Sequence, residues 1–157
     1  MNMKIGVTGT RSGMNSIQTE RVLDFLKNMY TNNTELHHGD CVGVDVEVAK
    51  IAKSLGYHIV CHPPIKNDLR GYFESDEYRE PLSYFARNRN IVDETNLLIV
   101  VPYQNEHQNN GGTWYTHDYG LKKKKRVEIF YPNPKISLDN FSSLGYILPM
   151  NDGGSNV

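Results

Sequence analysis

Residues 34–61 read TELHHGDCVGVDVEVAKIAKSLGYHIVC, and this stretch decides the fold. It opens with a strand-like run, passes through a loop that contains two glycines, and enters the clearest helical period of the chain. Apolar residues recur on one face of this predicted helix, at Val44, Val48, Ile51, Ala52 and Leu55. Gly56 supplies a C-cap, and residues 57–61 form a second strand-like run. A strand, a helical crossover and another strand predict a parallel βαβ unit.

The same alternation continues on both sides of this stretch. Further strands are predicted over residues 4–8, 97–101 and 127–131, and further helices over residues 16–30, 82–94 and 113–125. Ser16 is the predicted N-cap of the first helix. The pattern predicts an α/β fold: a Rossmann-like three-layer domain with a mainly parallel sheet of about five strands and helices on both faces. Residues 62–80 show no period, which favours a long functional loop that can close over the strand ends.

The length and composition are typical of one cytoplasmic domain. The chain has 157 residues, and we expect residues 1–131 to form the domain. Residues 132–157 should be an extension that packs on it and has a flexible end. Two cysteines indicate a reduced compartment, and neither a signal peptide nor a membrane span is expected. The formal net charge of −1 argues against nucleic acid as the main partner.

Two glycine-containing loops follow predicted strands and favour an anionic ligand. In parallel sheets of this kind, ligands bind outside the carboxyl ends of the strands. Glycines allow the backbone to approach a ligand closely, and the planar guanidinium of Arg11 suits a phosphate or carboxylate. Hydroxyl residues at a helix start add hydrogen-bond donors. The residues predicted to bind phosphate are Gly9, Thr10, Arg11, Ser12, Gly111, Gly112, Thr113 and Thr116.

A second group of residues is predicted to contact the ribose or base, or to support the site. Gly39 and Asp40 follow the second strand, where a carboxylate can accept hydrogen bonds from ribose hydroxyls. Asp40 and Asp45 can alternatively stabilise the start of the next helix. Trp114 either stacks on a base or packs in the core. The predicted supporting residues are Asp45, Arg87 and Asn88.

Other polar features favour simpler interpretations. His37 and His38 are neighbours in a strand and should point to opposite faces of the sheet, so no metal site is predicted. Cys41 has no obvious base partner and is interpreted as a small, unreactive residue. The basic run over residues 122–126 is interpreted as a solvated face that complements the helix dipole.

Four segments, in this order, resemble the SLOG superfamily. They are residues 9–11, 39–45, 87–91 and 111–116. The superfamily includes DNA-processing protein A, the "lonely guy" phosphoribohydrolases and small stand-alone proteins of phages and bacteria. The resemblance covers roughly residues 4–131. It implies a Rossmann-like sheet, a nucleotide-type ligand over the glycine loops, no required cofactor, and a homo-oligomer.

The resemblance implies binding more directly than catalysis. The phosphoribohydrolases carry Pro-Gly-Gly-x-Gly-Thr-x-x-Glu, whose glutamate serves N-glycosidic cleavage. When Gly112 and Thr113 are matched to the second Gly-Thr, Thr116 takes the place of that glutamate, and no proline precedes Gly111. No catalytic residue is therefore assigned, although Asp40 or Glu106 can substitute for the missing acid.

Three functions follow from the resemblance. The first is binding of a nucleotide, NAD-derived or cyclic-nucleotide signal molecule, which the protein senses or sequesters, as relatives in phage defence do. The alternative is a nucleotide N-glycosidase or phosphoribohydrolase. The third is binding of single-stranded DNA, which the near-zero net charge disfavours.

Overall fold

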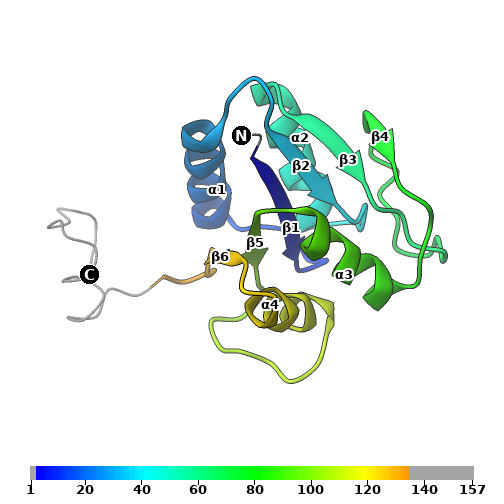
Figure 1. Cartoon of the computed structure of the whole chain (residues 1–157). Helices are drawn as coiled ribbons and strands as arrows, with labels where there is room; N and C mark the ends of the chain where they lie inside the picture. The colour runs from blue at the N-terminus through cyan, green and yellow to red at the C-terminus, as the bar shows by residue number, and fades with distance from the viewer. Residues whose placement is uncertain (1–2, 135–157) are drawn as a thin grey trace, which may run out of the picture.

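The computed structural model describes residues 3–134 (Figure 1). Its elements, in chain order, are β1 (Lys4–Gly9), α1 (Ser16–Met29), β2 (Glu35–His38), α2 (Val44–Leu55), β3 (His58–Cys61), β4 (Glu77–Tyr78), α3 (Tyr84–Glu94), β5 (Leu97–Val101), α4 (Gly112–Lys122) and β6 (Arg126–Ile129). Every predicted strand and helix is present, with ends that agree to within a few residues.

The strands form one parallel sheet in the order β4-β3-β2-β1-β5-β6. The chain moves outward from β1 through β2 and β3 to β4, and then returns to place β5 on the other side of β1. The strand order therefore reverses between β1 and β5, whose register pairs Ile5 with Leu97 and Gly9 with Val101. This topology confirms the α/β, Rossmann-like class, and the reversal point is where such folds bind ligands.

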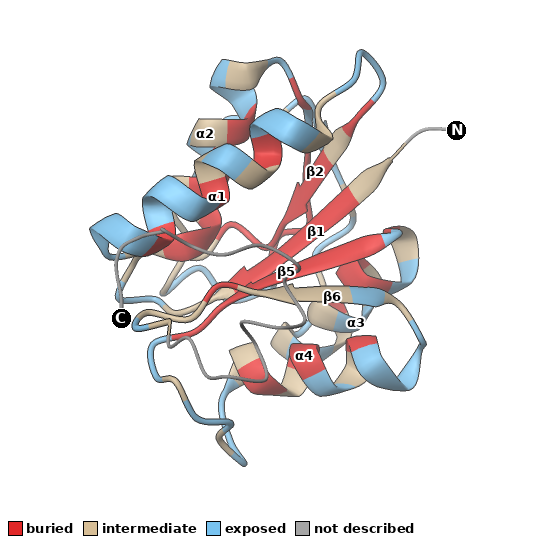
Figure 2. Cartoon of the chain, turned by 90° about the vertical axis from the view of Figure 1, so that its left-hand side faces the viewer, coloured by how far each residue is buried: buried red, intermediate tan, exposed pale blue. Residues whose placement is uncertain are grey.

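Helices cover both faces of the sheet, and Figure 2 shows that the buried residues concentrate in the strands. Side chains alternate between the faces, so Ile5 and Val7 join the core beneath α1 and α2. Leu98 and Val100 pack on the opposite face with Val92 of α3. Burial of each such side chain contributes roughly 1.5–3 kcal/mol, which explains why the strands are continuously apolar.

The start of α1 differs from the prediction by one residue. The N-cap is Asn15 and not Ser16. The Asn15 side-chain oxygen accepts a hydrogen bond from the Gln18 backbone N–H at 2.8 Å, and the Gln18 side-chain oxygen accepts one from the Asn15 N–H at 3.1 Å. This reciprocal pair is a capping box. Asparagine and serine are both good caps, and the glutamine three residues after Asn15 decides between them.

The predicted end of α2 is confirmed. Gly56 adopts a left-handed conformation with φ of 102°, and its N–H group caps the carbonyls of Ala52 and Lys53. A Cβ atom at this position would lie 2.7 Å from the Tyr30 hydroxyl, so glycine is required by both conformation and space. The chain turns here directly into β3.

The segment 62–80 contains a strand that the sequence did not predict. Glu77 and Tyr78 form β4, which pairs with β3 at the exposed edge of the sheet. Two exposed residues give no alternating pattern, so the strand depends on the neighbour with which it pairs. Elsewhere in the segment, the Gly71 N–H donates to the Asp40 carbonyl at 2.7 Å, and Val42 donates to Leu69 at 2.9 Å. The segment is therefore fastened to the loop after β2.

The C-terminal extension begins in contact with the domain. The Pro132 carbonyl accepts a hydrogen bond from the Asn15 side chain at 2.8 Å, and the Asn133 N–H donates to the Asn105 side chain at 3.1 Å. Residues 135–157, including the predicted flexible end, lie outside the described residues. Within residues 3–134, no helix combines the length and the apolar character that crossing a membrane requires.

Candidate functional site

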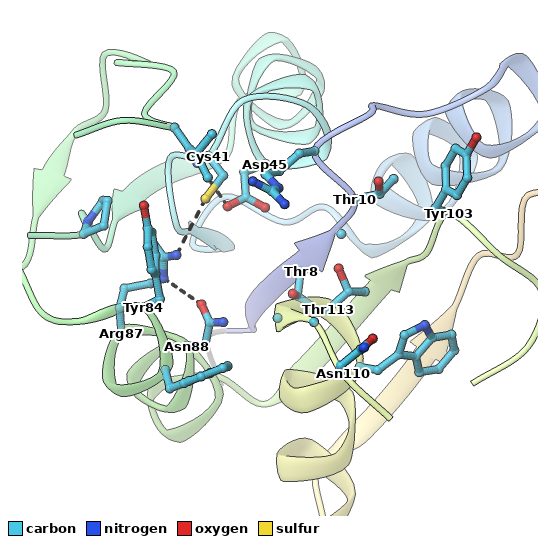
Figure 3. Close-up of a pocket in the computed structure, with 18 of the residues that line it drawn as sticks. Thr8, Thr10, Cys41, Asp45, Tyr84, Arg87, Asn88, Tyr103, Asn110 and Thr113 are labelled. Atoms are coloured by element: carbon cyan, nitrogen blue, oxygen red, sulfur yellow. Dashed lines mark hydrogen bonds between the residues drawn. The ribbon is translucent and has the colours of Figure 1, made fainter. Parts of the chain in front are cut away.

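A cavity of about 880 Å³ opens at the carboxyl edge of the sheet, beside the ends of β1 and β5 (Figure 3). Its walls come from the end of β1, the loop after β2, residues 64–69, the start of α3, the loop after β5 and the start of α4. This is the point where the strand order reverses. The volume lies within the range of small-molecule sites, about 300–1,000 Å³. The fold thus places a ligand-sized cavity at the edge that the loop motifs indicated.

The loop after β1 forms one wall of the cavity. Five consecutive residues line it: Thr8, Gly9, Thr10, Arg11 and Ser12. The Thr10 N–H donates to the Val101 carbonyl, and the Thr10 carbonyl accepts from the Val44 N–H, both at 3.1 Å. A Cβ atom on Gly9 would lie 2.4 Å from the Val44 side chain, so only glycine permits this packing. The loop is held rigidly between β5 and α2, while Arg11 is exposed at the cavity.

Arg87 is a buried cation in the opposite wall, with only 3% of its surface exposed. Its guanidinium donates to the carbonyls of Gly39 and His62, to the Asn88 side-chain oxygen at 2.6 Å and to the Cys41 sulfur at 3.6 Å. All of these partners, among the residues that the structure describes, are uncharged. The Asp45 carboxylate also interacts electrostatically with this guanidinium, so an anion bound in the cavity would share the positive charge with it.

The start of α4 faces the same cavity. Gly111 is the N-cap, with φ of 91° and no side-chain cap, so the first N–H groups of the helix have no partner within it. Gly112 and Thr113 line the cavity, and a Cβ atom on Gly112 would lie 3.5 Å from the Asn88 amide nitrogen. Asn88, which accepts from the Arg87 guanidinium, therefore lies beside the α4 start. Free N–H groups at a helix start favour a negatively charged group.

Asp45 is the one acidic side chain among the described residues that line the cavity. Its carboxylate accepts hydrogen bonds from the backbone N–H groups of Gly39 at 3.1 Å and Cys41 at 3.3 Å. Burial raises the pKa of Asp45 to about 6, although Arg87 opposes this rise. Burial and the Asp45 charge likewise raise the pKa of the Cys41 thiol, so this thiol stays protonated at neutral pH.

The aromatic rings that border the cavity differ in how far they are exposed. Trp114 is only 4% exposed and packs against His107 and His117, with ring centroids 4.9 and 5.0 Å away. Trp114 therefore packs as a core residue, and only a small part of its ring is open to contact with a base. Tyr103 is 64% exposed and Phe85 is 49% exposed, so both offer more ring surface for stacking. The sequence predicted neither of them.

Eleven of the predicted residues line the cavity: Gly9, Thr10, Arg11, Ser12, Asp45, Arg87, Asn88, Gly111, Gly112, Thr113 and Trp114. Gly39 and Thr116 do not. Gly39 accepts the Arg87 hydrogen bond through its carbonyl. The Thr116 hydroxyl donates to the Gly112 carbonyl at 2.7 Å and is buried within α4. Both residues hold the walls in place instead of forming the cavity surface.

Asp40, which was predicted to contact the ribose or base, is not among the residues that line the cavity. Its φ of 59° turns the chain, and its side chain is completely buried. One carboxylate oxygen accepts from the Phe73 N–H at 2.8 Å, and the other pairs with Arg70 at 2.9 Å. Both oxygens are thus occupied by the segment 62–80. Asp40 fastens this segment and is not free to contact ribose.

The segment 62–80 supplies cavity residues that were not singled out from the sequence. Pro64, Ile65, Lys66 and Leu69 line the wall, and Lys66 adds an exposed positive charge. The absence of a period over this length indicated a functional loop, but not which of its residues reach the site. Tyr103 follows β5 directly after Pro102, and this position at a strand end is the signal that identifies it.

No family model matches the sequence, and no curated protein matches it. Similar solved structures include the molybdenum cofactor binding protein from the phototrophic bacterium Rippkaea orientalis, with 19% identity over 82% of this chain and 76% of that chain, and a TM-score of 0.63. The Moco carrier protein from Chlamydomonas reinhardtii is 22% identical over 92% and 85% of the two chains, with a TM-score of 0.61. DNA processing protein A from Helicobacter pylori, which binds single-stranded DNA, is 15% identical over 93% and 74%, with a TM-score of 0.58.

These likenesses define the class of protein by its fold. The chain shares the Rossmann-like fold of these solved structures. DNA-processing protein A is common to the motif resemblance and to the structural likeness. Identities of this size establish the fold alone, so the function rests on the cavity and its residues.

Proposed function

We propose that the cavity binds a nucleotide-type anion, and that the protein senses or sequesters a nucleotide, NAD-derived or cyclic-nucleotide signal molecule. The observation that carries the proposal is the buried Arg87 guanidinium, whose described hydrogen-bond partners are all uncharged. A phosphate at the α4 start, beside Asn88, would be attracted by this positive charge, which it would share with the Asp45 carboxylate. Arg11 and Lys66 add exposed positive charge to the same cavity.

The remaining walls suit the other parts of such a ligand. Figure 3 shows Arg87 and Asn88 on one side of the cavity, and Asn110 and Thr113 on the other. We assign the phosphate to the α4 start, where the N–H groups are free, and the base to the exposed ring of Tyr103. Asn110 and Thr113 offer side-chain donors and acceptors for polar groups of the ligand.

The test is a calorimetric titration with defined ligands. The panel contains AMP, NAD, ADP-ribose and cyclic nucleotides, with the molybdenum cofactor and a single-stranded oligonucleotide included because similar folds bind them. The variant Thr113→Glu places a negative charge at the proposed phosphate position and should weaken nucleotide binding at least tenfold. Thr19→Glu, on the exposed face of α1, is the matched control and should bind normally.

Three results would contradict this proposal. The first is that no ligand of the panel binds, and the second is that Thr113→Glu binds the nucleotide with unchanged affinity. The third is that the protein binds the oligonucleotide more tightly than the nucleotides, with a steep salt dependence. Native mass spectrometry of protein purified from cells identifies a retained ligand directly. The homo-oligomer implied by the resemblance is part of the same proposal, and light scattering with and without ligand measures it.

Asp45 favours a second candidate function, cleavage of an N-glycosidic bond in a nucleotide. It is a carboxyl group in the cavity wall with a pKa of about 6, which suits a general acid near neutral pH. Asp40 is fully engaged with Arg70 and Phe73, so Asp45 is the better placed acid. This function would be supported if the wild type released free base from nucleoside monophosphates or NAD and the Asp45→Asn variant did not. Intact substrates after prolonged incubation would exclude it for those compounds.

A further inference from the structure

A polar cluster lies on the α3 face of the sheet, apart from the cavity. It joins His37 of β2, His62 after β3 and Glu94 at the end of α3. His37 Nδ1 lies 2.8 Å from His62 Nε2, and Glu94 Oε1 lies 3.9 Å from the first nitrogen and 4.0 Å from the second. Both imidazoles are buried. These are three atoms of the kind that bind divalent transition metals.

The spacing of these three atoms fits a metal ion. A circle through them has a radius of about 2.1 Å, so an ion in their plane lies at bonding distance from all three, and a tetrahedral site would need the two nitrogens to move apart. Zinc binds imidazole nitrogen at about 2.0–2.1 Å and carboxylate oxygen at about 2.0–2.2 Å. We propose that His37, His62 and Glu94 bind a divalent transition-metal ion of the Zn²⁺ type, with solvent completing the coordination.

The surroundings of the imidazoles support this assignment. Glu35 accepts a hydrogen bond from His37 Nε2 at 2.8 Å, which makes Nδ1 the nitrogen that carries the lone pair, and this lone pair now accepts from His62 Nε2. Metal-binding histidines commonly donate their second N–H to a carboxylate in this way. His62 Nδ1 has no hydrogen-bond partner among the described residues, so the proton that His62 Nε2 donates to His37 would have to leave or move to Nδ1 when a metal binds.

The charges around the cluster also favour a cation. Glu35 and Glu94 are partly exposed and both carry negative charge, so an ion can enter from solvent. Arg79 is the positive group in contact with Glu94: it donates to Glu94 Oε1 at 2.9 Å and pairs with Glu77 at 3.0 Å. Three carboxylates thus surround one guanidinium and two neutral imidazoles. Arg79 would hold the Glu94 carboxylate from outside, as outer hydrogen bonds do for metal-binding carboxylates.

In a second buried group, His38, Asp40 and Cys61, the imidazole and the carboxylate already have hydrogen-bond partners. His38 Nε2 pairs with the Ser75 hydroxyl at 2.9 Å, and His38 Nδ1 accepts from the Asp40 N–H at 2.9 Å. The Asp40 carboxylate is held by Arg70. His37 and His38 do lie on opposite faces, as the sequence predicted, and only tertiary contacts bring His37 to another histidine.

A third group, His107, His117 and Asp118, provides an internal control. One Asp118 oxygen lies 2.8 Å from a nitrogen of each imidazole, so this oxygen is shared by two hydrogen bonds. His107 and Asp118 are exposed on the surface. Any zinc that this group binds would be lost in a His107→Gln variant, which leaves the buried cluster unchanged.

The test is metal titration of the full chain after treatment with a chelator. We expect calorimetry to give one tightly bound Zn²⁺ per chain, and Co²⁺ to give the visible absorption of a four-coordinate site. His62→Gln and Glu94→Gln should each weaken Zn²⁺ binding at least tenfold. His58→Gln, an exposed histidine on β3, and His107→Gln should bind normally. Circular dichroism checks that each variant is folded, and the partly exposed Glu94 is the safer of the two ligand substitutions.

Two results would overturn the proposal. The first is a wild-type chain that binds no Zn²⁺ at micromolar concentrations. The second is binding that persists in folded Glu94→Gln but disappears in His107→Gln, which would place the ion at the surface group. Neither readout depends on nucleotide binding, so the metal site and the cavity proposal stand or fall separately.

Discussion

Arg87 joins the loops after β2 and β3 to α3 through hydrogen bonds to uncharged groups. The planar fork of arginine reaches several acceptors at once, which the single ammonium of lysine cannot do. The identity of this residue therefore matters beyond its charge. It fixes the cavity wall and leaves a positive charge for the ligand.

Arg87→Lys is expected to lower the free energy of unfolding by about 1–3 kcal/mol, because at least one buried carbonyl loses its partner. Urea denaturation measures the change. Arg89→Lys on the same helix is the control: Arg89 is exposed and donates one hydrogen bond, to the Tyr115 hydroxyl, so its change should stay within about 0.5 kcal/mol. Equal effects of the two substitutions would contradict the role assigned to Arg87.

Asp45 predicts a specific pH dependence of stability. Its pKa is raised from 3.8 to about 6 in the folded state, so the folded protein binds a proton that the unfolded chain releases between these values. Stability therefore falls as the pH rises from about 4 to about 6. The Asp45→Asn variant should not show this loss of stability. A pKa shift of about two units corresponds to a loss of about 3 kcal/mol in the free energy of unfolding.

Urea denaturation of the wild type and Asp45→Asn at pH 4 and pH 7 isolates the contribution of this carboxyl group. Histidines such as His38 also change protonation in this range, so the difference between the two proteins is the relevant quantity. The stability of Asp45→Asn relative to the wild type should increase with pH. A difference that is constant across the range would show that Asp45 has an ordinary pKa.

At the scale of elements, the start of α1 depends on one side chain. Asn15→Ala removes the cap and should destabilise the protein by about 1 kcal/mol. Ser16→Ala, one residue later, removes no capping bond and should change stability by less than about 0.5 kcal/mol. Thermal unfolding of both variants measures the contrast. The reverse order of effects would assign the cap to Ser16.

Much of the element pattern follows from local sequence. The apolar period and terminal glycine of α2, and the apolar run of β5, identify these elements because their signals lie within a few adjacent residues. β4 could not be identified in this way, because two exposed residues become a strand only by pairing with β3. The choice between Asn15 and Ser16 depends on the reciprocal contact between the cap and Gln18, three residues after Asn15.

At the scale of the whole molecule, stability should decrease from the centre of the sheet to its β4 edge. β1 and β5 are buried and flanked by strands on both sides, whereas β4 has two exposed residues and one neighbour. Hydrogen exchange measured by mass spectrometry should find the slowest-exchanging amides in β1 and β5. The amides of β4 should be among the fastest to exchange of all the strand amides. Uniform protection across the sheet would contradict this gradient.

The sequence by itself determined the α/β class, the parallel sheet and the edge at which a ligand-sized cavity opens. These features follow from periodicity and from glycine and capping residues, which act over a few neighbouring positions. Only the tertiary structure decided the roles of polar residues. Asp40 turned toward Arg70, Arg87 reached Gly39 across 48 residues, and His37 met His62 across 25. A polar side chain satisfies its hydrogen bonds with whatever the fold brings near it, and that partner is not written in the local sequence.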